Sequence, residues 1–185
     1  MYDVDLTTSM GTVYCGPACL RMLLAYYGID VPLETLIGEC SARIGGCSGA
    51  DLLRVGRAHG LDMTAWRVDA DELIGLDRPG IAWWTYNHWI VMCGRDENGN
   101  VVIANPSRGR YAIDPESFRV SYAGVALFNG SPMDLPEGWA VDENIPRDGL
   151  FLHQDKVWQA LEAIPKGGLA RPGRNCVKTT LNDIR

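Results

Sequence analysis

Apolar side chains near the N-terminus recur at the spacing that buries one face of a helix. This stripe consists of Leu20, Leu23, Leu24 and Tyr27. Pro17 suits the first turn of that helix, and Gly28 suits its end. Ser48 is a favourable N-cap for a later helix that stops before Gly60. The pattern therefore predicts helices over residues 17–27, 33–40 and 48–59.

The pattern changes after residue 60, where apolar, β-branched and aromatic residues alternate or run together as they do in strands. Strands are predicted over residues 61–68, 80–86, 88–95, 101–106 and 124–129. Short helical turns are predicted over residues 69–76 and 114–118. The Asn98-Gly99 pair is a strong hairpin signal, so the strands on either side of it pair antiparallel. Helices followed by antiparallel strands indicate an α+β domain.

The composition changes after Asn129, where Pro, Gly and Asp become frequent. We expect one domain over residues 1–129. Residues 130–185 are expected to form a linker and a C-terminal extension, with one helix over residues 153–164.

The charge and composition narrow the class of protein. The 185 residues carry a net charge of -6, which argues against nucleic acid as a partner. No apolar run is long enough to span a membrane, and the acidic N-terminus does not resemble a signal peptide. The cytoplasm is the expected compartment. The six cysteines contain no CxxC pair, so we expect neither a metal nor another cofactor. The oligomeric state stays open.

Cys15 has the setting of a candidate nucleophile. It stands just before Pro17, so we expect it at or before the N-cap of the first helix. Free backbone N–H groups and the helix dipole favour a thiolate there. Gly16 is expected to leave room for a substrate backbone. A small buried residue at a helix start is the alternative reading, and Cys19, one turn on, is predicted to be core.

A cysteine nucleophile needs a base and a residue that orients the base. His88 opens the strand "HWIVM", and Asn105 closes the strand "VVIANP" beyond the hairpin. Antiparallel pairing brings these two strand ends together. His59 lies at the predicted end of a helix and is expected to cap it. The structural alternatives are that His88 is a surface histidine and that Asn105 belongs to a simple Asn-Pro turn.

The chain resembles the C39 peptidases, papain-like cysteine proteases that include bacteriocin leader-processing domains. The resemblance rests on "CGPACLRMLLAYYG", "HWIVMCG" and "VIANPSRG", in the family's order and spacing, over roughly residues 8–128. It implies a papain-like fold with N-terminal helices packed on an antiparallel sheet. It also implies a peptide or protein substrate, with Cys15 as nucleophile, His88 as general base and acid, and Asn105 as orienting residue.

Two positions depart from the family. Asn105 stands where the family usually has Asp, and the segment before Cys15 contains no Gln to donate to an oxyanion. Ser9, Thr8, Thr12 or backbone N–H groups are the possible substitutes. The residues therefore predict a cysteine peptidase, with a papain-like acyltransferase and a catalytically weak peptide-binding module as alternatives.

Overall fold

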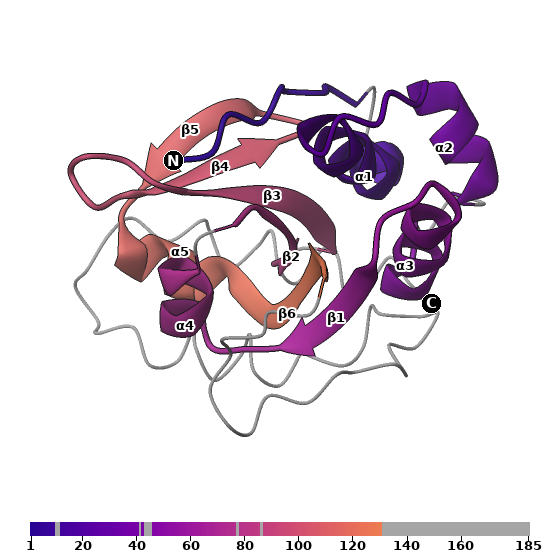
Figure 1. Ribbon diagram of the computed structural model, residues 1–185. Helices are drawn as coiled ribbons and strands as arrows, with labels where there is room; N and C mark the ends of the chain where they lie inside the picture. Colours follow the sequence, from indigo (N-terminus) through magenta and orange to yellow (C-terminus); the bar gives the residue numbers. More distant parts are fainter. Residues whose placement is uncertain (10–11, 41, 43–45, 77, 86, 131–185) are drawn as a thin grey trace, which may run out of the picture.

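The computed structural model describes residues 1–9, 12–40, 42, 46–76, 78–85 and 87–130 (Figure 1). The three predicted N-terminal helices are confirmed as α1 (Cys15–Tyr26), α2 (Leu33–Glu39) and α3 (Gly49–Ala58). Ser48 caps α3 as predicted, because its side chain accepts a hydrogen bond from the backbone N–H of Asp51. The C-terminal extension and its predicted helix lie outside the described residues.

The first helix begins two residues earlier than predicted. A 3-10 turn, η1 (Thr12–Tyr14), leads directly into Cys15, and Pro17 occupies the third helical position. The backbone N–H groups of a helix's first turn have no partner within the helix, so a proline costs no hydrogen bond there. Cys15 is therefore the first residue of α1 rather than a residue before it.

The strands form one antiparallel sheet in the order β1-β6-β2-β3-β4-β5. Their bounds are β1 (Met63–Arg67), β2 (Gly80–Trp84), β3 (His88–Arg95), β4 (Val101–Asn105), β5 (Gly109–Ile113) and β6 (Tyr122–Asn129). The hairpin at Asn98-Gly99 joins β3 to β4 as predicted. β5 was not predicted: it pairs only with β4, at the sheet edge, and none of its residues is fully buried. Such a strand has no strong apolar pattern.

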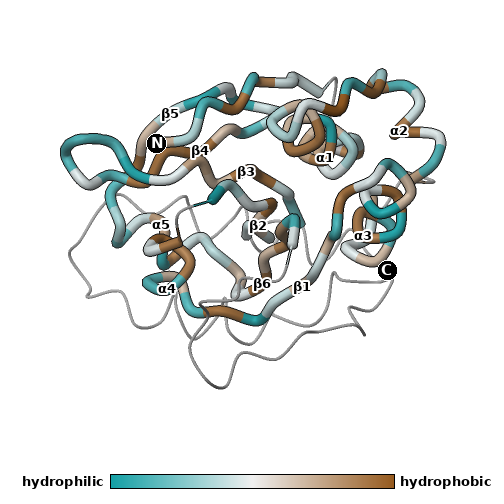
Figure 2. Tube along the Cα trace, viewed as in Figure 1, coloured by the Kyte–Doolittle hydropathy of each residue, from teal (hydrophilic) through white to brown (hydrophobic). Residues whose placement is uncertain are grey.

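Side chains alternate between the two faces of the sheet, and each face has its own helices. On β3, Trp89, Val91 and Cys93 join the core beneath α1 and α3, whereas Ile90 and Met92 join the opposite core. The opposite core includes residues of α4 (Ala70–Gly75) and α5 (Pro115–Ser121). Figure 1 shows α1 and α3 apart from α4 and α5, and Figure 2 shows apolar residues along α1 and β3. The predicted α+β fold is confirmed.

The N-terminal segment lies against the part of the sheet formed by β3, β4 and β5. The Tyr2 N–H donates to the Cys93 carbonyl at 2.7 Å, and the Arg110 guanidinium donates to the carbonyls of Tyr2 and Val4. The Ser9 N–H donates to the Pro106 carbonyl at 3.0 Å. The segment therefore runs from β3, in the middle of the sheet, to the end of β4 just before α1 begins. Within the described residues, no helix has the length and apolar character needed to cross a membrane.

Buried thiols predict a loss of stability in alkali. Burial raises the pKa of Cys93 to about 11 and raises that of Cys19 well above the ordinary value of 9.0. The unfolded chain therefore ionises first as the pH rises, and folding loses stability above about pH 9 at about 1.4 kcal/mol per pH unit for each such group. Urea unfolding at pH 8, 9 and 10 should show this fall, and Cys93→Ala should make it less steep. An unchanged slope in Cys93→Ala would contradict the assignment.

Candidate active site

Cys15 lies where the start of α1 meets the start of β3. Its side chain is 2% exposed, and the backbone N–H of Trp89 donates to Sγ at 3.5 Å. The N-cap residue, Tyr14, makes no side-chain capping bond, so no cap side chain takes the free N–H groups of the first turn. The thiol is thus next to backbone donors from two different elements.

The net effect of this environment on the thiol differs from the sequence prediction. Burial raises the pKa of Cys15, and it outweighs the backbone N–H groups of Trp89, Gly16 and Cys15, which lower it. The helix start therefore does favour the thiolate, but it does not overcome the loss of water around the sulfur. A cation beside the sulfur would favour the thiolate.

His88 and Asn105 are in direct contact at the same edge of the sheet. His88 Nε2 lies 2.9 Å from Asn105 Oδ1, because β3 begins where its hairpin partner β4 ends. The Asn105 side chain is 3% exposed. Trp89, which contacts the Cys15 sulfur through its N–H, is the residue after His88. The structure therefore brings all three predicted residues to one region.

A backbone contact establishes which way the Asn105 amide faces. The Ser107 N–H, which can only donate, lies 2.9 Å from the same Oδ1 atom. That atom is therefore the oxygen, and His88 must donate to it from a protonated Nε2. Nδ1 of the neutral ring is then the basic nitrogen. Burial lowers the pKa of His88, the Asn105 bond raises it, and Arg108 lowers it.

Gly16 is needed for internal packing. A Cβ atom at Gly16 would lie 3.0 Å from Cys47 Cβ and 3.2 Å from Trp89 Cδ1. The Trp89 indole N–H also donates to the Cys47 carbonyl at 2.9 Å. The end of the loop just before α3, at Cys47, therefore packs against the first turn of α1.

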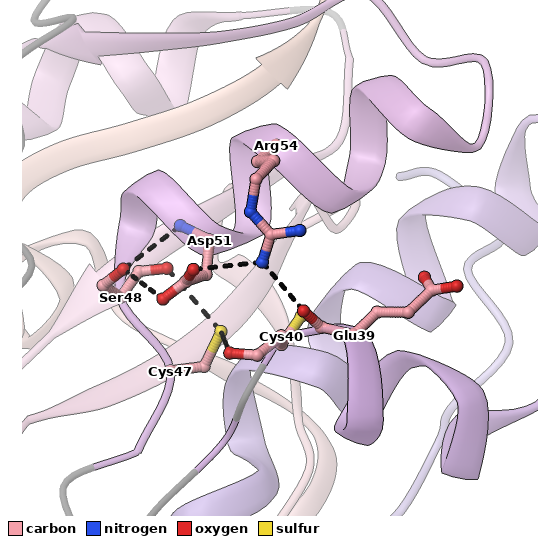
Figure 3. Close-up of polar contacts among 6 residues, drawn as sticks. All are labelled: Glu39, Cys40, Cys47, Ser48, Asp51 and Arg54. Atoms are coloured by element: carbon pink, nitrogen blue, oxygen red, sulfur yellow. Dashed lines mark hydrogen bonds and ion pairs between the residues drawn. The ribbon is translucent and has the colours of Figure 1, made fainter.

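Polar contacts brace this loop end against α2 and α3 (Figure 3). The Cys47 thiol faces the Cys40 carbonyl at 3.9 Å, and the Arg54 guanidinium joins the Glu39 carbonyl to the Asp51 carboxylate. These contacts link the end of α2 to the start of α3. They hold the surroundings of Cys15 without touching its sulfur.

The remaining residues of interest are in the core or at a helix end. Cys19 is fully buried, as predicted. His59 is the C-cap of α3 and pairs with Glu39 at 2.6 Å, in agreement with the expected capping role. Trp89 is in the core and makes an edge-on ring contact with Trp83, with the ring centroids 4.3 Å apart.

Among the described residues, no cluster of three or more His, Cys, Asp or Glu side chains could hold a metal.

Two features of the site were not predicted from the sequence. One is the Trp89 N–H, because a backbone donor to sulfur depends on how α1 packs on β3. The other is Tyr111, whose hydroxyl accepts from Asn105 Nδ2 at 3.4 Å. Tyr111 lies on β5, the strand that the sequence pattern did not indicate.

The buried cysteine at the start of a helix lies beside the start of a strand, and the histidine that opens this strand is bonded to an asparagine. This combination defines a papain-like cysteine protease fold. A profile of the peptidase C39 family matches residues 4–132, which is most of the chain. The chain therefore belongs to the peptidase C39 family, a family of cysteine peptidases, and the resemblance seen in the sequence is confirmed.

Solved structures and curated relatives agree with this assignment. A double glycine motif protease from an AMS/PCAT transporter, solved with its leader peptide, is 30% identical with a TM-score of 0.65, and the match covers 69% of this chain and 91% of that one. The peptidase domain of Streptococcus ComA, at 20% identity, shares the fold with a TM-score of 0.63 over 69% of this chain and 97% of that domain.

The curated relatives are much longer proteins. A probable microcin-H47 secretion/processing ATP-binding protein of Escherichia coli is 28% identical over 116 residues, which is 63% of this chain and 16% of that protein. The colicin V secretion/processing ATP-binding protein of the same species is 29% identical over a similar share. The chain thus matches about a sixth of the length of these relatives.

Proposed function

We propose that this chain hydrolyses peptide bonds, with Cys15 as the nucleophile, His88 as general base and acid, and Asn105 as the residue that orients His88. The contact between His88 Nε2 and Asn105 Oδ1, one residue from the N–H that reaches the Cys15 sulfur, carries the proposal. The proposal requires the thiol and the oriented imidazole to act on the same substrate carbonyl.

In the proposed mechanism the Cys15 thiol is the proton donor and the neutral His88 ring is the acceptor. Burial disfavours the charged form of each group, because it raises the pKa of Cys15 and lowers that of His88. Attack on a substrate carbonyl is therefore accompanied by transfer of the Cys15 proton to His88. The imidazolium then gives this proton to the leaving amine, which yields an acyl-enzyme and the first product.

Water completes the reaction. His88 removes a proton from water as the water oxygen attacks the thioester. The C–S bond then breaks, His88 returns the proton to the Cys15 sulfur, and the carboxylic acid product is released. Backbone N–H groups of the first turn of α1 are the proposed oxyanion donors in place of the missing Gln, because no cap side chain occupies them. Ser9, anchored to the Pro106 carbonyl beside Asn105, is a side-chain candidate for the same task.

The substrate class follows from the relatives. The solved double glycine motif protease was crystallised with a leader peptide, and the curated relatives are secretion/processing proteins. We therefore propose that the substrate is a peptide whose cleaved bond follows two glycines. Glycines at the cut site would let the substrate backbone approach Cys15, a residue that is only 2% exposed.

A peptide electrophile tests the nucleophile directly. A Gly-Gly peptide ending in a chloromethyl ketone should modify Cys15 alone, as located by peptide mapping, and the His88→Ala variant should react far more slowly. The matched reagent ending in Ala-Ala should react less. Slow, equal modification of all the cysteines would refute the proposal. In a separate assay with a cleavable Gly-Gly peptide, capture of an added amine by the acyl-enzyme would indicate a transferase instead.

We also propose that the functional unit is residues 1–129 and that it works in the cytoplasm. The boundary is supported by the family profile, which ends at residue 132, and by β6, which ends at Asn129. The compartment is supported by the five described cysteines, which are all free thiols.

A further inference from the structure

The Asn105 side chain makes three hydrogen bonds that use both ends of its amide. Oδ1 accepts from His88 Nε2 and from the Ser107 N–H, each at 2.9 Å. Nδ2 donates to the hydroxyl of Tyr111 at 3.4 Å. The first two contacts are part of the proposed triad and its turn, whereas the third joins the triad to a residue with no assigned role.

The direction of this amide decides whether His88 can work. If the amide turned over, Nδ2 would face the His88 N–H and the Ser107 N–H, so donors would face donors. The ring would then have to move its proton to Nδ1, the nitrogen that must accept the proton of Cys15. The Ser107 N–H opposes this turn at the oxygen end of the amide, and a partner for Nδ2 anchors the other end.

Tyr111 is well placed for this task. It lies on β5 opposite Ile103, so its side chain stands on the face of the sheet that also carries Asn105, two residues further along β4. Its ring is partly buried against the core that contains Ile103 and Phe118. A packed ring on a paired strand presents its hydroxyl from a constant position.

We propose that Tyr111 is a positioning residue, whose hydroxyl accepts the Asn105 Nδ2–H and thereby holds Oδ1 toward His88. This inference rests on the proposed function and adds a residue to it. The task arises because residue 105 is an asparagine. The two oxygens of an aspartate are equivalent, so a carboxylate could turn over without presenting a donor to the ring.

The kinetic test is Tyr111→Phe, which removes the hydroxyl and keeps the ring. We expect kcat for a Gly-Gly peptide to fall about two- to tenfold, as for the loss of one neutral hydrogen bond, with little change in KM. The acidic limb of the kcat/KM profile should also move to lower pH, because the Asn105 bond raises the pKa of His88. Arg108, the charged side chain that acts on His88, is unchanged in this variant.

Two controls separate positioning from a general structural effect. Tyr2→Phe removes a hydrogen bond of the same 3.4 Å length, to the Leu76 carbonyl, and should leave both kcat and the acidic limb as in the wild type. In an Asn105→Asp background, Tyr111→Phe should no longer move the limb to lower pH. Equal effects of Tyr111→Phe in both backgrounds, or equal effects of Tyr2→Phe and Tyr111→Phe, would overturn the proposal.

A readout that needs no substrate keeps this inference separate from the proposed function. Nitrogen NMR of the His88 ring should show neutral imidazole protonated at Nε2 in the wild type and a mixture of tautomers in Tyr111→Phe. An unchanged tautomer in Tyr111→Phe would refute the role of Tyr111 even if the enzyme cleaves peptides. Failure of the wild type to cleave any Gly-Gly peptide would refute the proposed function and leave the tautomer result standing.

Discussion

Cys15→Ala is expected to lower the rate of Gly-Gly peptide cleavage by about 10⁴- to 10⁶-fold, the range seen when a triad nucleophile is removed. Without the sulfur, no acyl-enzyme forms, and only the oxyanion donors and substrate binding remain to assist water. The loss should appear in kcat rather than in KM. Product formation followed by mass spectrometry, at enzyme concentrations close to those of substrate, can measure a residual rate this low.

The chain supplies a matched control for this substitution. Cys19 lies one turn further along α1 and is fully buried, so Cys19→Ala makes the same chemical change in the same helix. It should retain activity within a few-fold. Cys15→Ala combined with His88→Ala should be no slower than either alone, because the two groups act as a unit. A Cys15→Ala enzyme within tenfold of the wild type would contradict the assignment.

Phe128→Ala is expected to have the largest effect on stability, lowering the free energy of unfolding by about 3–5 kcal/mol. Phe128 is fully buried on β6, in the core between the sheet and the two short helices α4 and α5. Truncation removes a large apolar side chain and leaves a cavity that the neighbouring strands cannot fill. Urea unfolding at pH 7 measures the loss directly.

The neighbouring Gly80 provides a test of the same packing from the other side. A Cβ atom at Gly80 would overlap Cε1 of Phe128, so Gly80→Ala should cost about 1–3 kcal/mol through overpacking. In the Phe128→Ala background the ring is gone, and the same methyl group should cost much less. Gly38→Ala, at a helical position with no atom within 4 Å of the new Cβ, is the control and should not destabilise. Additive costs for Gly80→Ala and Phe128→Ala would show that the two sites do not share a contact.

Much of the fold follows from local patterns. The apolar stripe of α1, the Ser48 cap of α3 and the Asn98-Gly99 hairpin each depend on a few neighbouring residues, so the amino-acid sequence was sufficient to predict them. The hairpin also places the start of β3 beside the end of β4. The pairing of His88 with Asn105 was therefore predictable from the sequence pattern.

The start of α1 was predictable only in part. A proline is tolerated anywhere in the first turn, so Pro17 marks that turn without marking its first residue. The edge strand β5 was missed for a related reason, since a strand paired on one side and open to water on the other carries little apolar pattern.

The sequence by itself determined the helix that carries Cys15, the antiparallel hairpin that carries His88 and Asn105, and the membership of the C39 family. The helix and the hairpin depend on interactions between residues close in the chain. The tertiary structure alone decided the burial that shifts the pKa of Cys15 and the support of the asparagine. Burial of the Cys15 sulfur beneath β3 raises the pKa of its thiol against the local helix effect, and β5 brings the Tyr111 hydroxyl to Asn105. Both depend on how distant segments pack, because desolvation and hydrogen-bond geometry are set by everything that surrounds an atom and not by its neighbours in sequence.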